Sequence, residues 1–283
     1  MGSYRDVLRE GERRLRESGR ESSAAKLLLL HFSGLSATTL YTDFTADMPD
    51  DKEKAFFSAL NEHIEKHRPV QYITGEAFFY GYNFHVDESA LIPRYETEEL
   101  VMNLLMLLDE RFPSKTLDVV DVGTGSGCIA IALKKEAPRL HVVATDIEED
   151  ALTLARKNAE SLDADVAFFA GDTLDAVKDK NVDVIVSNPP YIPNEEALER
   201  IIVEHEPHAA LYGGNDGLDF YRTIVRASKA ILRAPGVLAF EHAYDKKKEL
   251  QTLIKEVYPH AEVWTLKDMQ GRNRMTFAVT PGP

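Results

Sequence analysis

Cysteine and long apolar runs are nearly absent from this sequence. Cys128 is the only cysteine among 283 residues, which excludes an intramolecular disulfide and a cysteine-cluster metal site and fits a reducing compartment. The leucine run Leu27–Leu30 is far shorter than a membrane-spanning helix, and Met1–Asp6 contains no apolar signal region. We therefore expect a cytoplasmic protein that has no membrane partner.

Basic residues are also few relative to acidic ones. The sequence has 33 Lys and Arg residues against 47 Asp and Glu residues, which gives a net charge of −14. This balance, without a basic stripe, counts against a nucleic-acid-binding surface, so we expect no direct nucleic-acid partner. His205 and His208 flank Glu206 but lack the His-Glu-x-x-His spacing of a zinc site, and we expect no metal.

The composition is that of a soluble globular protein, with 44% apolar and 28% charged residues. Three charge-rich stretches with apolar residues at helical spacing predict a helical first part. These stretches cover Tyr4–Arg20, Ser22–Phe32 and Asp51–Lys66. The aromatic segment Phe78–Val86 then predicts a β-hairpin with Gly81 in its turn.

From Thr116 onward, strand patterns and helix patterns alternate, which predicts an α/β domain with a largely parallel sheet covered by helices. The expected strands are Leu117–Val122, His141–Asp146, Val166–Ala170, Val182–Val186, Val237–Glu241, Glu262–Leu266 and Met275–Val279. No helix pattern separates the last two strands, so we expect them to pair antiparallel. The chain is thus divided into a helical domain at 1–75, a hairpin linker at 76–92 and an α/β domain at 93–283.

A glycine-rich loop follows the first parallel strand and opens a helix. Its sequence is Asp121-Val122-Gly123-Thr124-Gly125-Ser126-Gly127, and closely spaced glycines allow a tight turn and close approach of a ligand to the backbone. Such a loop alone is compatible with NAD, FAD, a nucleotide or S-adenosylmethionine. The alternating spacing differs from the G-x-G-x-x-G of dinucleotide sites. Asp146, which closes the second strand, stands at the distance along the chain expected for a ribose-binding acid.

A second motif, Asn188-Pro189-Pro190-Tyr191, follows the fourth strand directly. Two prolines cannot continue a sheet ladder, so the chain must leave the sheet in a stiff loop. This loop holds the Asn188 side chain and nearby main-chain carbonyls in one arrangement, and both groups can accept hydrogen bonds. Two fixed acceptors suit a planar NH2 group, because each takes one N–H and the face of the nitrogen stays open. Taken alone, however, the motif is also compatible with a proline-rich turn.

Together the motifs resemble those of class I S-adenosylmethionine-dependent methyltransferases. The pattern D-x-G-x-G-x-G resembles the first motif of that family, and Asp146 resembles its ribose-binding acid. Gly171-Asp172-Thr173 matches the position that contacts adenine. The tetrapeptide at 188–191 matches the N/D-P-P-Y/F/W motif, which the family keeps where the methyl acceptor is a planar, unreactive nitrogen. The resemblance implies S-adenosylmethionine as cofactor and a Rossmann-like domain with a mostly parallel seven-stranded sheet.

Segments outside the cofactor core resemble the release-factor glutamine methyltransferases in particular. These segments are Pro69–Gly75, the aromatic hairpin, Leu91–Glu98, Glu206-Pro207, Phe240–His242 and Gly271–Arg274. The resemblance implies a small helical domain joined by a hairpin to the methyltransferase domain, and methylation of the glutamine in the Gly-Gly-Gln loop of peptide-chain release factors. Tyr95, His205 and Ala243 depart from the usual pattern of that family, which bears on partner contacts.

The resemblance also implies roles for individual residues. Asn188 and the Pro189 carbonyl hold the amide NH2, and Tyr191 forms a wall of the pocket. The expected substrate-binding residues are these three together with Pro190. The expected cofactor-binding residues are Gly123, Thr124, Gly125, Ser126, Gly127, Asp146, Asp172, Thr173 and Asn188. No strong general base is evident, and none is needed, because the methylated amide can lose its proton to water. We expect a monomer.

Four alternatives remain at this stage. A ribosomal-protein glutamine methyltransferase shares the same chemistry and tetrapeptide. The acidic balance disfavours a nucleic-acid adenine methyltransferase, and the glycine spacing disfavours a dinucleotide oxidoreductase. A binding module that has lost activity is disfavoured because both motifs are complete.

Overall fold

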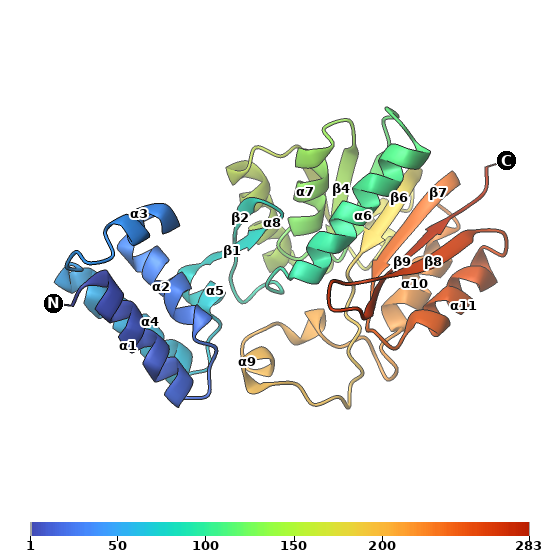
Figure 1. Ribbon diagram of the computed structural model, residues 1–283. Coiled ribbons are helices and arrows are strands. Elements are labelled where there is room, and N and C mark those ends of the chain that lie inside the picture. The colour runs from blue at the N-terminus through green and yellow to red at the C-terminus, as the bar shows by residue number, and fades with distance from the viewer. Residues whose placement is uncertain (1, 283) are drawn as a thin grey trace. The chain divides into compact units, whose positions relative to one another are not determined.

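The computed structural model describes residues 2–282, which form two compact units (Figure 1). The first unit comprises the chain up to Glu76 together with Leu198–His205, and the second comprises Ala77–Ala197 and the chain from Glu206 onward. The hairpin that the sequence assigns to a linker is therefore grouped with the second unit. The domain boundaries at residues 75 and 93 stay predictions.

The first unit is a set of helices around a leucine-rich core. Its helices are α1 (Tyr4–Glu17), α2 (Ser23–Ser33), α3 (Ala37–Thr42), α4 (Asp50–Glu65), α5 (Val70–Thr74) and α9 (Arg200–Val203). Leu15, Leu28 and Leu60 are fully buried. Gly11 permits α1 to approach α4, because a Cβ there would lie 2.7 Å from the Phe56 ring. The three helical stretches expected from the sequence are confirmed as α1, α2 and α4.

The second unit begins with the expected hairpin, formed by β1 (Glu76–Phe79) and β2 (Tyr82–His85). Tyr80 and Gly81 both have positive φ in the tight turn, where glycine is favoured. Phe79 and Phe84 are fully buried in the core of the second unit. The hairpin thus contributes to this core, since its two buried rings pack edge to face 5.9 Å apart.

A seven-stranded sheet forms the centre of the second unit, in the order β5-β4-β3-β6-β7-β9-β8. The strands are β3 (Asp118–Val122), β4 (His141–Asp146), β5 (Val166–Ala170), β6 (Val182–Ser187), β7 (Leu232–Glu241), β8 (Glu262–Lys267) and β9 (Asn273–Val279). Neighbouring strands from β5 to β7 are parallel, and β9 runs antiparallel to both β7 and β8. The mostly parallel seven-stranded sheet is therefore confirmed.

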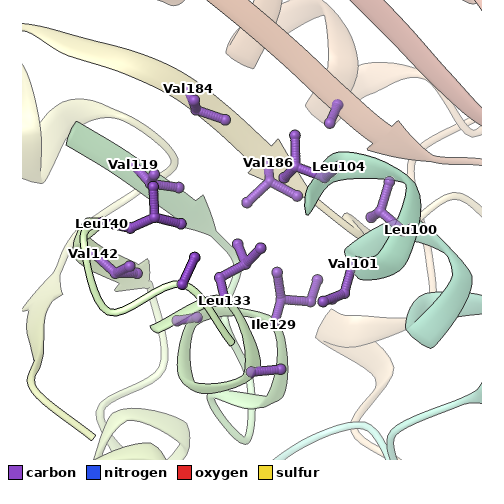
Figure 2. Close-up of a cluster of buried hydrophobic side chains, with 14 of the residues drawn as sticks. Leu100, Val101, Leu104, Val119, Ile129, Leu133, Leu140, Val142, Val184 and Val186 are labelled. Atoms are coloured by element: carbon purple, nitrogen blue, oxygen red, sulfur yellow. The ribbon is translucent and has the colours of Figure 1, made fainter. Parts of the chain in front are cut away.

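Apolar residues on the strands point alternately to the two faces of this sheet, and helices cover both faces. These helices are α6 (Tyr95–Arg111), α7 (Cys128–Glu136), α8 (Glu149–Ser161), α10 (Asp219–Ser228) and α11 (Lys247–Val257). Figure 2 shows one core, in which Val119 and Val186 of the strands meet Leu104 of α6 and Leu133 of α7. The next residue along β3, Val120, packs instead with α10 and α11 on the opposite face. Short 3-10 turns occur at Asp175–Val177 and His208–Ala210.

Within residues 2–282, no helix has the length and apolar character that crossing a membrane requires.

Candidate active site

A cavity of about 420 Å³ opens in the second unit where the parallel strands end. Its walls come from the loops after β3, β4, β5 and β6 and from the segment Ser89–Arg94. β3 lies between β4 and β6, so the chain order reverses here, and the crevice at such a reversal is where open α/β sheets bind ligands. The charged residues lining the cavity are Asp146, Glu148, Asp172 and Arg94, so acidic groups outnumber basic ones.

The glycine loop turns sharply from β3 into α7. The N–H groups of Gly123 and Thr124 both donate to the Thr145 carbonyl at 2.9 Å. Gly123 and Gly125 have φ of 70° and 55°, a left-handed conformation that favours glycine. A Cβ on Gly123 would meet no atom within 4 Å. Protein packing therefore leaves the space above this residue open toward the cavity.

Gly127 packs inward, and its cofactor-binding role stays a prediction. Its φ is 83°, and a Cβ there would lie 3.0 Å from Ile131 and 3.2 Å from Ala155. Gly127 thus allows α7 to pack closely against α8, and it does not line the cavity. This close packing matches the known use of the last glycine in glycine-rich βα turns.

Asp121 lies fully buried beneath the glycine loop. Its Oδ2 accepts a hydrogen bond from Thr124 Oγ1 at 2.6 Å and another from the Ala130 N–H at 3.2 Å. Its Oδ1 has no partner among the described residues. Burial outweighs these hydrogen bonds and raises the pKa of Asp121 to about 7.

Asp146 is held at the end of β4 by two backbone donors. The Gly125 N–H donates to Oδ2 at 2.8 Å, and the Glu148 N–H donates to Oδ1 at 3.0 Å. Asp172, which follows β5, has an exposed side chain at the cavity wall. Thr173 beside it adopts a φ of 48°, and its carbonyl accepts a hydrogen bond from Thr145 Oγ1 at 2.9 Å. These contacts fix the cavity ends of β4 and β5 relative to each other.

Asn188 leaves β6 with its side chain at the cavity. Its Nδ2 donates to Thr97 Oγ1 at 3.1 Å. Among the described residues, no group donates to Asn188 Oδ1 or to the Pro189 carbonyl. Ser187 anchors the start of the loop, because its Oγ donates to the Val122 carbonyl at 2.6 Å. Both Asn188 and Pro189 line the cavity, so it contains two acceptors that intramolecular bonds leave unused.

Tyr191 lies behind this loop and outside the cavity lining. Its hydroxyl donates to Glu241 Oε1 at 3.5 Å, and Thr97 Oγ1 donates to Glu241 Oε2 at 2.7 Å. Glu241 is 1% exposed at the end of β7. Burial raises the pKa of Glu241 to about 7, against the lowering influence of the Thr97 hydrogen bond and the Arg274 charge. Burial and the nearby Glu241 charge also raise the pKa of Tyr191.

A second segment supports the tetrapeptide from behind. The Ile192 N–H donates to the Leu211 carbonyl at 3.0 Å, and the Gly213 N–H donates to the Ile192 carbonyl at 2.9 Å. A Cβ on Gly213 would collide with the Pro190 carbonyl oxygen and would lie 2.9 Å from Tyr191 Cα. The tetrapeptide is therefore fixed by a close backbone contact that only glycine permits.

Glu206 is hydrogen-bonded to Ile92 and Arg94, two residues that line the cavity. It is 4% exposed, and its carboxylate accepts hydrogen bonds from Arg94 at 2.5 Å and from the Ile92 N–H at 3.3 Å. This pairing joins the segment after the hairpin to the chain at Glu206. Glu206 and Arg94 belong to the segments that carry the family resemblance, but the sequence does not reveal that they pair.

The structure places most of the predicted site residues around one cavity. The lining includes Gly123, Thr124, Gly125, Ser126, Asp146, Asp172, Thr173, Asn188, Pro189 and Pro190. Gly127 and Tyr191 lie outside it, so the pocket-wall role of Tyr191 stays a prediction. Thr97, Glu241 and Gly213 also support the site, and the sequence predicts no individual role for them. Each belongs to a chain segment distant from the motif it supports, and residue spacing therefore gives no sign of the contact.

Two other reactive side chains are Cys128, which lines the cavity, and His205. Cys128 opens α7, but burial raises the pKa of its thiol to about 12, which disfavours the thiolate form. His205 Nε2 lies 2.7 Å from the Lys66 carbonyl. Among residues 2–282, no group of three or more His, Cys, Asp or Glu side chains is placed to hold a metal ion.

Comparison with known proteins places this geometry among methyltransferases. The family model described as PrmC N-terminal domain matches residues 6–75, and that described as methyltransferase small domain matches residues 102–214. A release factor glutamine methyltransferase of Bacillus subtilis (strain 168) is 40% identical over 287 residues, covering 99% of this chain and 98% of that protein. One from Geobacter sulfurreducens is 41% identical over 265 residues, covering 92% and 91%.

A solved structure gives the same result for the fold alone. A methyltransferase from Pyrococcus furiosus superposes with a TM-score of 0.52 at 20% identity, covering 83% of this chain and 100% of that one.

Proposed function

This chain belongs to the family of release factor glutamine methyltransferases, and on that premise we propose what its cavity does. It transfers a methyl group from S-adenosylmethionine to the side-chain amide nitrogen of the glutamine in the Gly-Gly-Gln loop of a peptide-chain release factor. The observation that carries this proposal is the pair of unused acceptors, Asn188 Oδ1 and the Pro189 carbonyl, at the wall of the cavity.

The residues around the cavity fit S-adenosylmethionine. A volume of about 420 Å³ is in the range of small-molecule sites, and the acidic lining suits a ligand with cationic groups. We assign the methionine part to the loop at Gly123–Ser126, the ribose to Asp146 and the adenine to Asp172 and Thr173. When bound, S-adenosylmethionine supplies an electrophilic methyl group on a sulfonium.

Asn188 and Pro189 would then orient the acceptor. The Asn188 Oδ1 and the Pro189 carbonyl each accept one N–H of the glutamine amide, which leaves the face of its nitrogen open to the methyl group. The nitrogen lone pair is delocalised into the carbonyl, so transfer depends on alignment and on a site that excludes water. We assign to Tyr191 the wall of this amide pocket, since it belongs to the same tetrapeptide as the acceptor pair, two residues after Pro189. The nitrogen gains a methyl group and loses one proton to water.

We assign recognition of the release factor to the first unit. Within residues 2–282, this unit contributes no strand to the seven-stranded sheet and no residue to the cavity lining. The matched PrmC N-terminal domain covers residues 6–75, which correspond to this unit. Binding energy obtained far from the glutamine can position the amide against its two acceptors.

A direct assay tests the proposed function. The protein is incubated with labelled S-adenosylmethionine and a purified release factor, and the methylated residue is located by mass spectrometry. We expect one methyl group on the Gly-Gly-Gln glutamine and none on a factor in which that glutamine is replaced by glutamate. Purified ribosomal proteins and DNA serve as parallel substrates. Methylation of either, with the release factor unchanged, would contradict the substrate assignment.

A further inference from the structure

We propose that Thr97 and Glu241 form a positioning chain that fixes the orientation of the Asn188 amide. The inference rests on the proposed function of Asn188 as an acceptor for the glutamine amide. Asn188 Nδ2 donates to Thr97 Oγ1 at 3.1 Å, and Thr97 Oγ1 donates to Glu241 Oε2 at 2.7 Å. Neither Thr97 nor Glu241 needs to touch the reacting atoms, because both act through Asn188.

The direction of each hydrogen bond follows from counting protons. An ionised carboxylate can only accept, so the single hydroxyl proton of Thr97 is directed toward Glu241. The oxygen of Thr97 can then only accept from Asn188, which requires the NH2 group of Asn188 to face it. The Oδ1 of Asn188 is consequently turned away from Thr97 and stays available for the substrate amide. The opposite orientation would present an NH2 group to another NH2 group.

The three residues come from elements that the fold holds rigidly. Thr97 is 3% exposed in the first turn of α6. Glu241 ends β7, and its main-chain carbonyl accepts a hydrogen bond from the Tyr221 hydroxyl of α10 at 2.6 Å. The chain from Asn188 to Glu241 thus links β6, α6 and β7. A buried network of this kind restricts a side chain to one orientation, because an unsatisfied alternative is costly.

The protonation state of Glu241 controls the chain. Groups facing Glu241 are Glu96 on α6, Cys128 on α7, Tyr191 after β6, Tyr221 on α10 and Arg274 on β9. Burial raises the pKa of Glu241 to about 7. A protonated Glu241 can donate to Thr97, whose own proton then becomes free to bond Asn188 Oδ1. The Asn188 amide group can then flip so that its oxygen faces Thr97. The Oδ1 atom is then no longer available to accept a hydrogen bond from the substrate amide.

Substitutions at Thr97 test the hydroxyl directly. Thr97→Val keeps the shape of the side chain and removes the hydroxyl, whereas Thr97→Ser keeps the hydroxyl. With the release factor as substrate and saturating cofactor, we expect Thr97→Val to lower kcat about three- to tenfold, the equivalent of one neutral hydrogen bond. Thr97→Ser should stay near the wild-type kcat. Thr280→Val is the control, because Thr280 is a similarly buried threonine, 4% exposed, at the end of the sheet away from the cavity. Its Oγ1 accepts a hydrogen bond from the Gly236 N–H.

A pH profile tests Glu241 and does not depend on the Thr97 variants folding. We expect the kcat of the wild-type protein to fall as the pH drops below about 7, and we expect Glu241→Gln to remove this acidic limb. Cofactor affinity, measured by calorimetry, should change less than twofold in the folded variants. In the double variant Thr97→Val, Glu241→Gln, the loss of activation free energy should be smaller than the sum of the losses in the two single variants, because both residues act through the same positioning chain.

The outcomes separate the two proposals. A wild-type protein that leaves release factors unmethylated contradicts the proposed function itself. An active wild-type protein with a Thr97→Val variant of equal kcat overturns the positioning chain. Thr97→Ser as slow as Thr97→Val also overturns it, since shape rather than the hydroxyl would then matter. If the fall of kcat at acidic pH persists in the Glu241→Gln variant, Glu241 has no role in the positioning chain.

Discussion

The Gly125 N–H donates to Asp146 Oδ2 across 2.8 Å, so the glycine loop and the end of β4 form one connected surface. The residues involved are 21 positions apart in the chain. The other carboxylate oxygen of Asp146 accepts from the Glu148 N–H. Asp146 therefore faces the cavity in an orientation that two backbone donors fix before any ligand binds, and it still has lone pairs for ribose hydroxyls.

Replacement of Asp146 tests this arrangement. Asp146→Ala removes a charged acceptor for the ribose and the brace of the glycine loop. We expect S-adenosylmethionine affinity to fall by roughly 1.5–3 kcal/mol, the range for a hydrogen bond to a charged group. Isothermal calorimetry measures the affinity. The matched control is Asp150→Ala, an exposed acid in the first turn of α8, and an equal loss in that variant would contradict the assignment.

Asn188 is expected to affect turnover more than cofactor binding. Asn188→Ala removes an acceptor that aligns the amide, and we expect kcat on the release factor to fall on the order of a hundredfold or more. Asn188→Asp keeps an acceptor but loses the donor to Thr97 and adds a charge near Glu241, so it should also be slow. Single-turnover assays at saturating cofactor measure the effect. Near-wild-type turnover in either variant would exclude the assigned role.

The close approach of Gly213 to the tetrapeptide gives a third prediction. Gly213→Ala places a Cβ against the Pro190 carbonyl and Tyr191 Cα, which must displace the loop that presents Asn188. We expect kcat to fall at least about tenfold, because small misplacement of an aligning group is costly, while cofactor affinity stays close to that of the wild type. Gly282→Ala is the control, since its Cβ would meet only Pro235 at 3.6 Å. Equal kcat values for the two variants would contradict this prediction.

The sequence predicts the sheet well because its central strands β3, β4 and β6 are rich in valine and isoleucine, and β-branched residues favour strands. The start of β7 differs from the prediction, because the pattern places it at Val237 and the strand begins at Leu232. Pro235 and Gly236 interrupt the apolar pattern there, and both are poor strand residues. Pairing with β6 nevertheless extends the strand, since Val182 is registered with Leu232. Tertiary pairing here overrides the local preference.

The candidate site was predictable only in part. Its motif residues follow strand ends, and parallel strands bring such ends together, so Asp146 and Asn188 could be expected near the glycine loop. The bond between Thr97 and Glu241 joins residues 144 positions apart. Only the packing of α6 against the end of β7 creates it. Spacing rules describe local geometry, and they contain no information on such a contact.

Buried Asp121 predicts a stability effect with a definite sign. Its pKa is raised to about 7 in the folded protein, whereas an unfolded chain releases this proton near pH 3.9. The folded state therefore binds the extra proton, and its stability declines as the pH rises from about 4 through about 7. The asparagine side chain of the Asp121→Asn variant stays neutral, so the variant does not lose this stability. As the pH rises through this interval, the free energy of unfolding of the wild type should fall relative to that of the variant by up to roughly 4 kcal/mol.

Urea denaturation of both proteins at pH 5 and pH 8 measures the part of this difference that develops above pH 5, roughly 3 kcal/mol. Other titrating groups act equally on the two proteins, so they cancel in the comparison. A difference in unfolding free energy that stays constant between the two pH values would show that Asp121 ionises normally.

Removal of residues 1–76, which leaves Leu198–His205 of the first unit in place, tests the role in recognition that we assign to the first unit. A chain that begins at Ala77 retains Phe79 and Phe84, which are fully buried in the core of the second unit. We expect it to bind S-adenosylmethionine with near-wild-type affinity and to lose most activity on the intact release factor, because binding energy remote from the glutamine is gone. Calorimetry and the mass-spectrometric assay measure the two properties.

Two comparisons sharpen this last prediction. A chain that begins at Leu91 lacks both phenylalanines and should be less stable, since loss of each buried ring costs roughly 3–5 kcal/mol. A short Gly-Gly-Gln peptide should be a poor substrate for both the full chain and the Ala77 truncation, because it cannot contact the first unit. If the truncated protein methylates the intact release factor as fast as the full chain does, recognition resides in the second unit and the assignment of the helices is wrong.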